Sequence, residues 1–137
     1  MPKPLNKRWV ASRPFAAVDP HGKKRRVVLR IGLPYKISQR EWACPVSAAG
    51  IQGHLHDISG SDSLQALCLG ISLVRMLVEN FLKAGGKLID PVGKAEWSHS
   101  DFESVFGRVG SHQTKQRLSK NAKPKARPSG PTKPVSR

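Results

Sequence analysis

The chain has 137 residues, with 24 Lys and Arg against 9 Asp and Glu, and a formal net charge of +15. This length fits one domain with tails, and it excludes a barrel enzyme of ordinary size or two full domains. Hydrophobic residues make up 38% of the chain. That share is low for a chain folded from end to end, so we expect part of it to be unfolded.

The charge is concentrated at the two ends of the chain. Residues 1–40 carry 11 basic and 1 acidic residue, residues 41–110 carry 5 basic and 8 acidic, and residues 111–137 carry 8 basic and none acidic. A mildly acidic core between basic ends is therefore expected. Such ends attract nucleic acid, anionic lipid or an acidic protein.

The cysteine content and the N-terminal sequence indicate a reduced, cytoplasmic protein. Cys44 and Cys68 are the two cysteines, and they form no C-x-x-C motif. A secreted domain of this size more often has several disulfides. No apolar run of about seven or more residues follows the basic N-terminus, so no signal peptide is predicted.

The first part of the chain predicts a β-hairpin. Residues 8–18 alternate as a half-buried strand, and Pro14 indicates an edge position or a bulge. Residues 19–22 read Asp-Pro-His-Gly, a turn sequence. Residues 25–33 follow as the clearest strand. The expected inward residues of the two strands are Trp9, Ala11, Phe15, Ala17, Val27, Leu29, Ile31 and Leu33.

Two further strands are expected before residue 60. Trp42, Cys44 and Val46 alternate inward, with Pro45 indicating an irregular or edge strand. Residues 51–56 form a fourth candidate strand, bounded by glycines. Its predicted outward residues are Gln52, His54 and His56.

The strongest predicted element is a long helix. Asp62 with Gln65 three residues later is a capping-box pattern, residues 64–84 contain no proline, and two glycines follow. The expected inward face is Leu67, Ile71, Val74, Val78 and Phe81. Three charges and a polar stripe argue against a membrane span.

The remaining sequence predicts a short strand at residues 88–89 and a short helix at residues 101–108, capped by Ser100. We predict a flexible arm in residues 1–7, an α+β domain in residues 8–109 and a disordered basic tail in residues 110–137. Within the domain we expect a three- to four-stranded antiparallel meander packed on the long helix.

The candidate carrier and metal-binding residues have plainer structural explanations. The segment 60–67 is similar to the phosphopantetheine attachment site of acyl carrier proteins, which implies modification at Ser63; helix capping by Asp62 explains the same residues. The potential zinc ligands diverge in the predicted strands. These ligands are Cys44, His54, His56 and Cys68. No hydrolase, zinc-protease or nucleotide-loop motif occurs, so no enzyme, cofactor or metal site is expected.

Two basic surfaces are the candidate binding sites. If the long helix covers one sheet face, the other face displays Arg26, Arg30, His54 and His56. The tail adds Lys120, Lys123, Lys125 and Arg127, in a segment loosely similar to a minor-groove hook in which Ala126 replaces the glycine. An ordinary solvated sheet face and a tail that only aids solubility explain the same residues.

Residues 30–35, 41–45 and 60–67 together resemble a small bacterial family of uncharacterised proteins, over residues 24–86. The resemblance implies a compact sheet-plus-helix domain, no known activity and no catalytic residues to carry over. From the basic termini and the open basic sheet face we predict a non-enzymatic binding module that engages nucleic acid or an acidic protein. A protein-interaction module and a carrier domain modified at Ser63 remain the alternatives.

Overall fold

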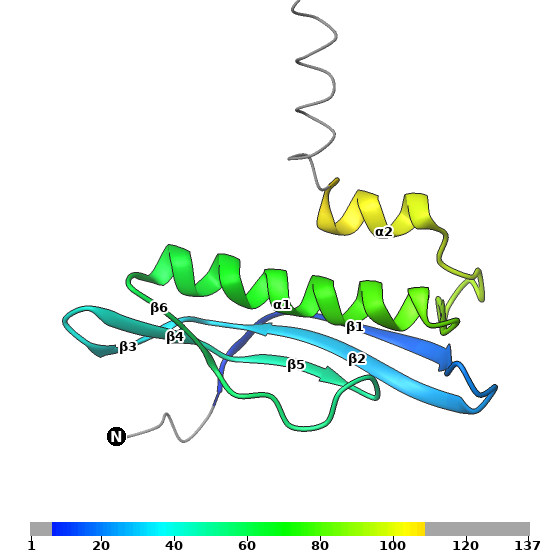
Figure 1. The fold of residues 1–137 in the computed structure, drawn as a ribbon, viewed down its shortest axis with the longest axis horizontal. Coiled ribbons are helices and arrows are strands. Elements are labelled where there is room, and N and C mark those ends of the chain that lie inside the picture. Colours follow the sequence, from blue (N-terminus) through cyan, green and yellow to red (C-terminus); the bar gives the residue numbers. More distant parts are fainter. Residues whose placement is uncertain (1–6, 109–137) are drawn as a thin grey trace, which may run out of the picture. The chain divides into compact units, whose positions relative to one another are not determined.

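The computed structural model describes residues 7–108 (Figure 1). It divides into two compact units, Met1–His99 and Ser100–Arg137. The first unit is α+β, as predicted: antiparallel strands form two sheets, and one long helix, α1, lies along them. The predicted arm and the predicted tail lie almost wholly outside the described residues.

The larger sheet is built on the predicted hairpin. Strand β1 (Trp9–Val18) pairs with β2 (Lys24–Gly32), and the sheet order is β5-β2-β1-β7. The outer strands are β5 (Val46–Ala49) and β7 (Lys87–Ile89). Pro14 lies beyond the part of β1 that pairs with β7, which spans residues 16–18. Its missing N–H therefore interrupts no bond on that side.

The smaller sheet continues the same ribbon past two prolines. Its strands β3 (Tyr35–Ser38), β4 (Glu41–Cys44) and β6 (Ile58–Gly60) lie in the order β3-β4-β6. Pro34 and Pro45 separate it from the larger sheet, because proline cannot donate to a ladder. The Gly32 N–H donates to the Pro45 carbonyl at 2.7 Å, which keeps the ribbon paired across the break.

Two strand predictions are wrong. Residues 51–57 form a loop, and pairing resumes only at β6. Trp9 and Ala11 are exposed instead of inward, because the ladder between β1 and β2 shifts register between them. A bulge of this kind disturbs the alternation on which the prediction depended.

Helix α1 (Ser63–Lys83) begins and ends where the sequence predicts. The Asp62 carboxylate accepts from the Gln65 N–H at 2.8 Å. At the other end Gly85 adopts a φ of 105°, and the N–H of Gly86 donates to the Phe81 carbonyl at 2.9 Å. This is the glycine-dependent Schellman arrangement, which satisfies carbonyls at a helix end.

The buried face of α1 is rotated from the predicted one. Ala66, Gly70, Val74 and Val78 are buried, whereas Ile71 is 37% exposed. A Cβ on Gly70 would lie 3.0 Å from Val46 and 3.1 Å from the Cys44 sulfur. Small residues therefore let the helix approach both sheets closely, and proximity to the backbone outweighs side-chain size in choosing the buried face.

The core lies between α1 and the sheets. Its fully buried large side chains are Phe15, Leu88, Val27, Val74, Val78, Pro45 and Cys44. In the second unit, α2 (His99–Phe106) confirms the predicted short helix, and the Phe102 and Phe106 rings lie 5.1 Å apart. The helix starts before Ser100, so this residue lies inside it instead of capping it.

Candidate anion-binding face

The two faces of the larger sheet carry different side chains. Partners in an antiparallel ladder point to the same side. Val46 lies against α1 and pairs with Ile31, so the side of β2 that bears Val27 and Leu29 is the covered one. The opposite side has no covering helix among residues 7–99, and we call it the open face.

The ladder registers place the residues of the open face in rows. One row joins Lys24, Val18 and Lys87, and the next joins Arg26, Ala16 and Ile89. Val28 pairs with Pro14 and with Ala49, and Arg30 pairs with Ser12 and with Ser47. The prediction that Arg26 and Arg30 share the uncovered side follows from this register.

Four cations of the open face have no carboxylate partner among the residues that the structure describes. Lys24, Arg26, Arg30 and Lys87 are all exposed, and none forms a salt bridge within the part of the chain that the structure describes. Arg25, on the other side of the same strand, differs, because its Nε donates to Asp19 at 2.9 Å. The open face therefore keeps its positive charge available to an outside anion.

An aromatic side chain lies at one end of this face. The Arg30 guanidinium lies 5.7 Å from the centre of the Trp9 ring, and Trp9 is 36% exposed. The prediction treated Trp9 as inward and missed this contact. The only indication in the sequence that the strand around Trp9 is irregular was the proline that this strand contains.

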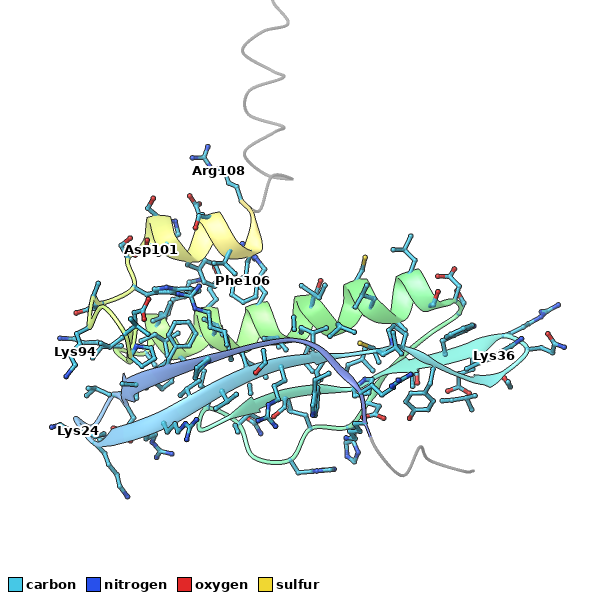
Figure 2. The ribbon with its side chains drawn as sticks, turned by 180° about the vertical axis from the view of Figure 1, so that it is seen from behind. Lys24, Lys36, Lys94, Asp101, Phe106 and Arg108 are labelled. Carbon is cyan, nitrogen blue, oxygen red and sulfur yellow. The ribbon has the colours of Figure 1, made fainter. Side chains whose placement is uncertain are left out.

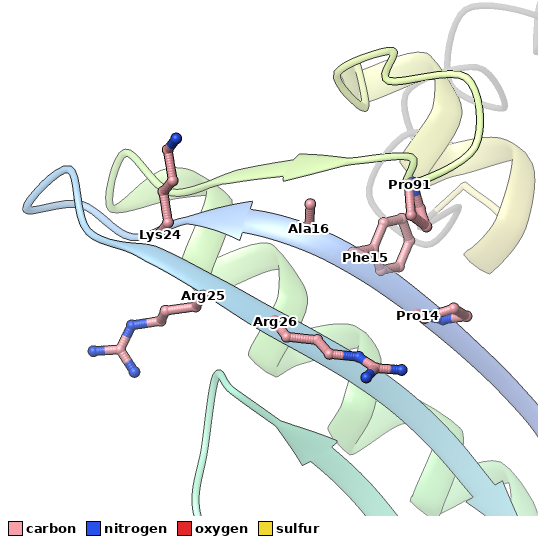
Figure 3. Close-up of a pocket in the computed structure, with 7 residues that line it drawn as sticks. All are labelled: Pro14, Phe15, Ala16, Lys24, Arg25, Arg26 and Pro91. Atoms are coloured by element: carbon pink, nitrogen blue, oxygen red, sulfur yellow. The ribbon is translucent and has the colours of Figure 1, made fainter.

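Two shallow hollows lie at the other end of the face, over β1 and between the neighbouring strands β2 and β7. One has a volume of about 480 Å³ and the other about 430 Å³. Ala16, Lys24, Arg25 and Pro91 line both of them, and Figure 3 shows the lining of the larger one. Pro14 and Arg26 also line the larger hollow, and Ile89, Asp90 and Lys94 also line the smaller one. The hollows were not predicted, because β7 is distant from β1 in sequence.

Two carboxylates lie near these hollows. The Asp90 carboxylate lies 3.5 Å from the Arg13 guanidinium and accepts the Val92 N–H at 2.9 Å, so its charge is already engaged. Glu96 pairs with Ile89 and so brings a carboxylate to the outer edge of the row that joins Arg26, Ala16 and Ile89. The cationic character is therefore strongest over β2.

The other predicted binding residues are not gathered on this face. His54 and His56 lie on the loop after β5, where their rings contact each other with centroids 5.3 Å apart. The predicted strand that would have carried them onto the face does not form. Lys120, Lys123, Lys125 and Arg127 lie outside the described residues.

The proposed zinc ligands are also separate. Cys44 is buried and faces Gly70, whereas Cys68 is exposed on α1. Burial raises the pKa of the Cys44 thiol. Within residues 7–108 no group of three His, Cys, Asp or Glu side chains is arranged to hold a metal ion.

Ser63 is exposed at the first position of α1. Strands precede it, so the fold differs from the four-helix bundle of the carrier proteins that this segment resembles. The bond from Gln65 to Asp62 accounts for the motif as a helix cap. Modification at Ser63 stays a prediction, which an intact mass after co-expression with a transferase tests.

A tyrosine–carboxylate pair closes the reverse side of the smaller sheet. The Tyr35 hydroxyl donates to Asp57 at 2.6 Å, and the Lys7 ammonium lies 3.2 Å from the same carboxylate. Burial and the neighbouring carboxylate raise the pKa of Tyr35 to about 12. A phenol this weakly acidic, hydrogen-bonded and partly buried acts as a structural donor.

Asp19 fixes the hairpin that carries the open face. Its Oδ1 accepts the N–H groups of His21 and Lys23, both at 2.9 Å. The backbone bond from Lys23, followed by the Arg25 side chain, lowers the pKa of Asp19. The tight turn holds Lys24 and Arg26 at a fixed distance from β1.

Comparison with known protein families gives a match. A family model described as "Domain of unknown function (DUF6968)" matches residues 11–89. The resemblance to a family of uncharacterised proteins is confirmed, and the match extends beyond residues 24–86 at both ends. Searches of the curated proteins and of the solved structures each found no match.

Proposed function

We propose that this chain, which belongs to the DUF6968 family of domains of unknown function, is a non-enzymatic module that binds nucleic acid through its open face. One observation carries the proposal: Lys24, Arg26, Arg30 and Lys87 lie on one sheet face without carboxylate partners in residues 7–108. Phosphates neutralised by such side chains supply most of the affinity in sequence-independent binding.

The geometry of strand β2 supports contacts to a polyanion. Lys24, Arg26 and Arg30 project from the same side of β2. At about 3.3 Å per residue, Arg26 and Arg30 are about 13 Å apart along the strand, and Lys24 precedes Arg26 by about 7 Å. A line of cations on a rigid strand suits an extended chain of phosphates better than a single small anion. The two free thiols support work in a reducing, cytoplasmic setting.

The test compares two charge-matched double variants of the full chain. Arg26→Gln with Arg30→Gln removes two cations from the open face, and Lys36→Gln with Arg40→Gln removes two exposed cations from the β3–β4 hairpin. Figure 2 shows Lys36 at the opposite end of the sheets from Lys24. The affinity of a labelled single strand and of a labelled duplex is measured by fluorescence anisotropy between about 50 and 200 mM salt.

The open-face variant is expected to lower affinity and to reduce the salt slope by about 1.4 for a single strand, or about 1.8 for a duplex. The hairpin variant should leave the slope within about 0.5 of the unmodified chain. Equal slopes for the two variants, or no binding near 50 mM salt, would overturn the proposal. Binding of acidic protein but not of either oligonucleotide would overturn it in favour of a protein partner.

A protein-interaction module is the second candidate, because α1 exposes apolar side chains. Leu64 is 69% exposed, Leu69 44% and Met76 47%. By length and composition α1 also meets the criteria for a membrane span, although it lies along both sheets. Light scattering on the purified chain tests the candidate. A dimer that Leu69→Ser with Met76→Ser dissociates supports it, and a monomer that retains no native partner removes it.

A further inference from the structure

We propose that the hollow over Ala16 receives an unpaired base, so that the nucleic acid bound by the open face is single-stranded. This inference rests on the proposed function and specifies its ligand. The inference depends on the shape and lining of the hollows at the end of the open face near β7. Contacts to phosphates alone would not need these hollows.

The depth of the hollow comes from one small side chain. Ala16 lies in the row between Arg26 and Ile89, so a methyl group is flanked by two long side chains. Pro14 and Pro91 lie beside it and add ring surface without N–H groups (Figure 3). The side chains of the floor are therefore apolar, and they offer no hydrogen-bond donors to a phosphate or a sugar.

The rim of the larger hollow is cationic, because Lys24 and Arg26 of β2 line it. The smaller hollow is lined by Lys24, by Asp90, which Arg13 already engages, and by Lys94 on the turn after β7, where the Lys94 φ is 58°. The backbone of that turn is fixed by the bond from the Lys94 N–H to the Asp90 carbonyl, at 2.7 Å. An apolar floor inside a cationic rim matches a planar ring attached to phosphates.

A duplex does not place its bases on an apolar floor of this kind. Its outer surface presents phosphates and sugars, and its bases are stacked inside. An unpaired base exposes its ring face and can lie on apolar, aromatic or guanidinium surfaces. The hollows, of about 430 and 480 Å³, fall within the usual range of small-ligand sites, which runs from about 300 to 1,000 Å³.

The same face offers a second stacking surface. The half-exposed Trp9 ring with the Arg30 guanidinium lies toward the other end of the β1–β2 pair. A single strand that follows β2 therefore passes the hollow, with Lys24 and Arg26 at its rim, and then the Arg30 guanidinium with the Trp9 ring. Stacking of this kind tolerates any base sequence.

The test fills the hollow without changing charge. Ala16→Leu in the full chain occupies the floor, and Ala49→Leu is the matched control, since Ala49 is equally an exposed alanine of the open face but lines neither hollow. Anisotropy is measured with a labelled oligothymidylate and with a labelled duplex of the same length. Ala16→Val, which suits a strand, serves as a second filling variant.

Ala16→Leu is expected to weaken oligothymidylate binding about tenfold, the loss of one stacked base, and to change duplex binding less than about twofold. Ala49→Leu should leave both affinities within about twofold. If Ala16→Leu and Ala16→Val match the control on the single strand, the inference is overturned while the phosphate contacts stand. If neither probe binds the unmodified chain, the proposed function falls as well.

Discussion

The covered and open faces of the larger sheet are made by the same two strands and differ in every physical respect. On the covered face Phe15, Val27 and Leu29 are at most 7% exposed, and the Phe15 ring lies 4.7 Å from that of Trp97. On the open face Ala16 and Arg26 are exposed, although each is a chain neighbour of a core residue. Successive residues of a strand point to opposite sides, so one segment can specify both a core and a binding surface. Stability and charge can therefore be changed independently.

The largest expected effect comes from a substitution on the covered face, and it tests whether the two faces are independent. Leu29→Ala removes buried methyl groups between β2 and α1, and we expect it to lower the free energy of unfolding by about 2–5 kcal/mol. Arg26→Gln, three residues away on the open side, should change stability by no more than about 0.5 kcal/mol. Urea denaturation of both variants checks the contrast. A stability loss of equal size in Arg26→Gln would show that the open face belongs to the core.

The smaller sheet sharpens the comparison, because part of its reverse side is covered. Tyr35 pairs with Ala43, which is 2% exposed, and the Tyr35 hydroxyl donates to Asp57. The single tyrosine of the chain allows a direct test by absorbance titration. We expect a Tyr35 pKa of about 12 in the folded chain, against an ordinary value of 10.0.

The direction of the linked stability change follows from this pKa. A folded-state pKa above the unfolded value favours the folded state fully below about pH 10, and the contribution is lost as the pH rises toward 12. Asp57→Asn should lower the Tyr35 pKa, because it removes the charge that opposes the phenolate. A midpoint near 10 in the unmodified chain would contradict the partly buried hydrogen bond from Tyr35 to Asp57 at 2.6 Å.

The elements of the fold that depend on local chemistry were predictable from the sequence. The turn from Asp19 to Gly22, the cap at Asp62 and the glycines after Lys83 each act within a few residues. The alternation in residues 25–33 correctly placed Arg26 and Arg30 opposite Val27 and Leu29. These features need no knowledge of distant contacts.

The features that depend on distant contacts were missed. The hollow over Ala16 exists because β7 pairs with β1 across about seventy residues of sequence. The buried face of α1 is set by Gly70 meeting Cys44 and Val46, which no helical periodicity reveals. The loop at 51–57 took His54 and His56 off the sheet, because apolar–polar alternation alone does not provide a pairing partner.

A smaller effect concerns how α1 covers its face. Asp62→Ala removes the acceptor for the Gln65 N–H, and we expect a loss of about 1 kcal/mol in the free energy of unfolding. Asp62→Asn retains an acceptor and should lose only a few tenths of that amount. Thermal unfolding followed by circular dichroism compares the two variants. Since the cap is remote from the open face, nucleic-acid affinity should stay unchanged in both.

The smallest expected effect concerns the charge at the edge of the open face. Glu96 lies at the outer edge of the row that contains Ile89, Ala16 and Arg26. A carboxylate there repels phosphate, so Glu96→Gln should tighten binding of the oligothymidylate about twofold at low salt, with the gain vanishing as salt increases.

Glu41→Gln is the matched control for this substitution, because Glu41 lies on the smaller sheet and accepts from the Ser59 hydroxyl at 3.2 Å. It removes the same charge from the whole chain. If both variants tighten binding equally, the gain reflects net charge alone and the nucleic acid does not reach β7. If Glu96→Gln alone tightens binding, the path of the nucleic acid crosses β7, and the open face acts as a surface with a defined direction.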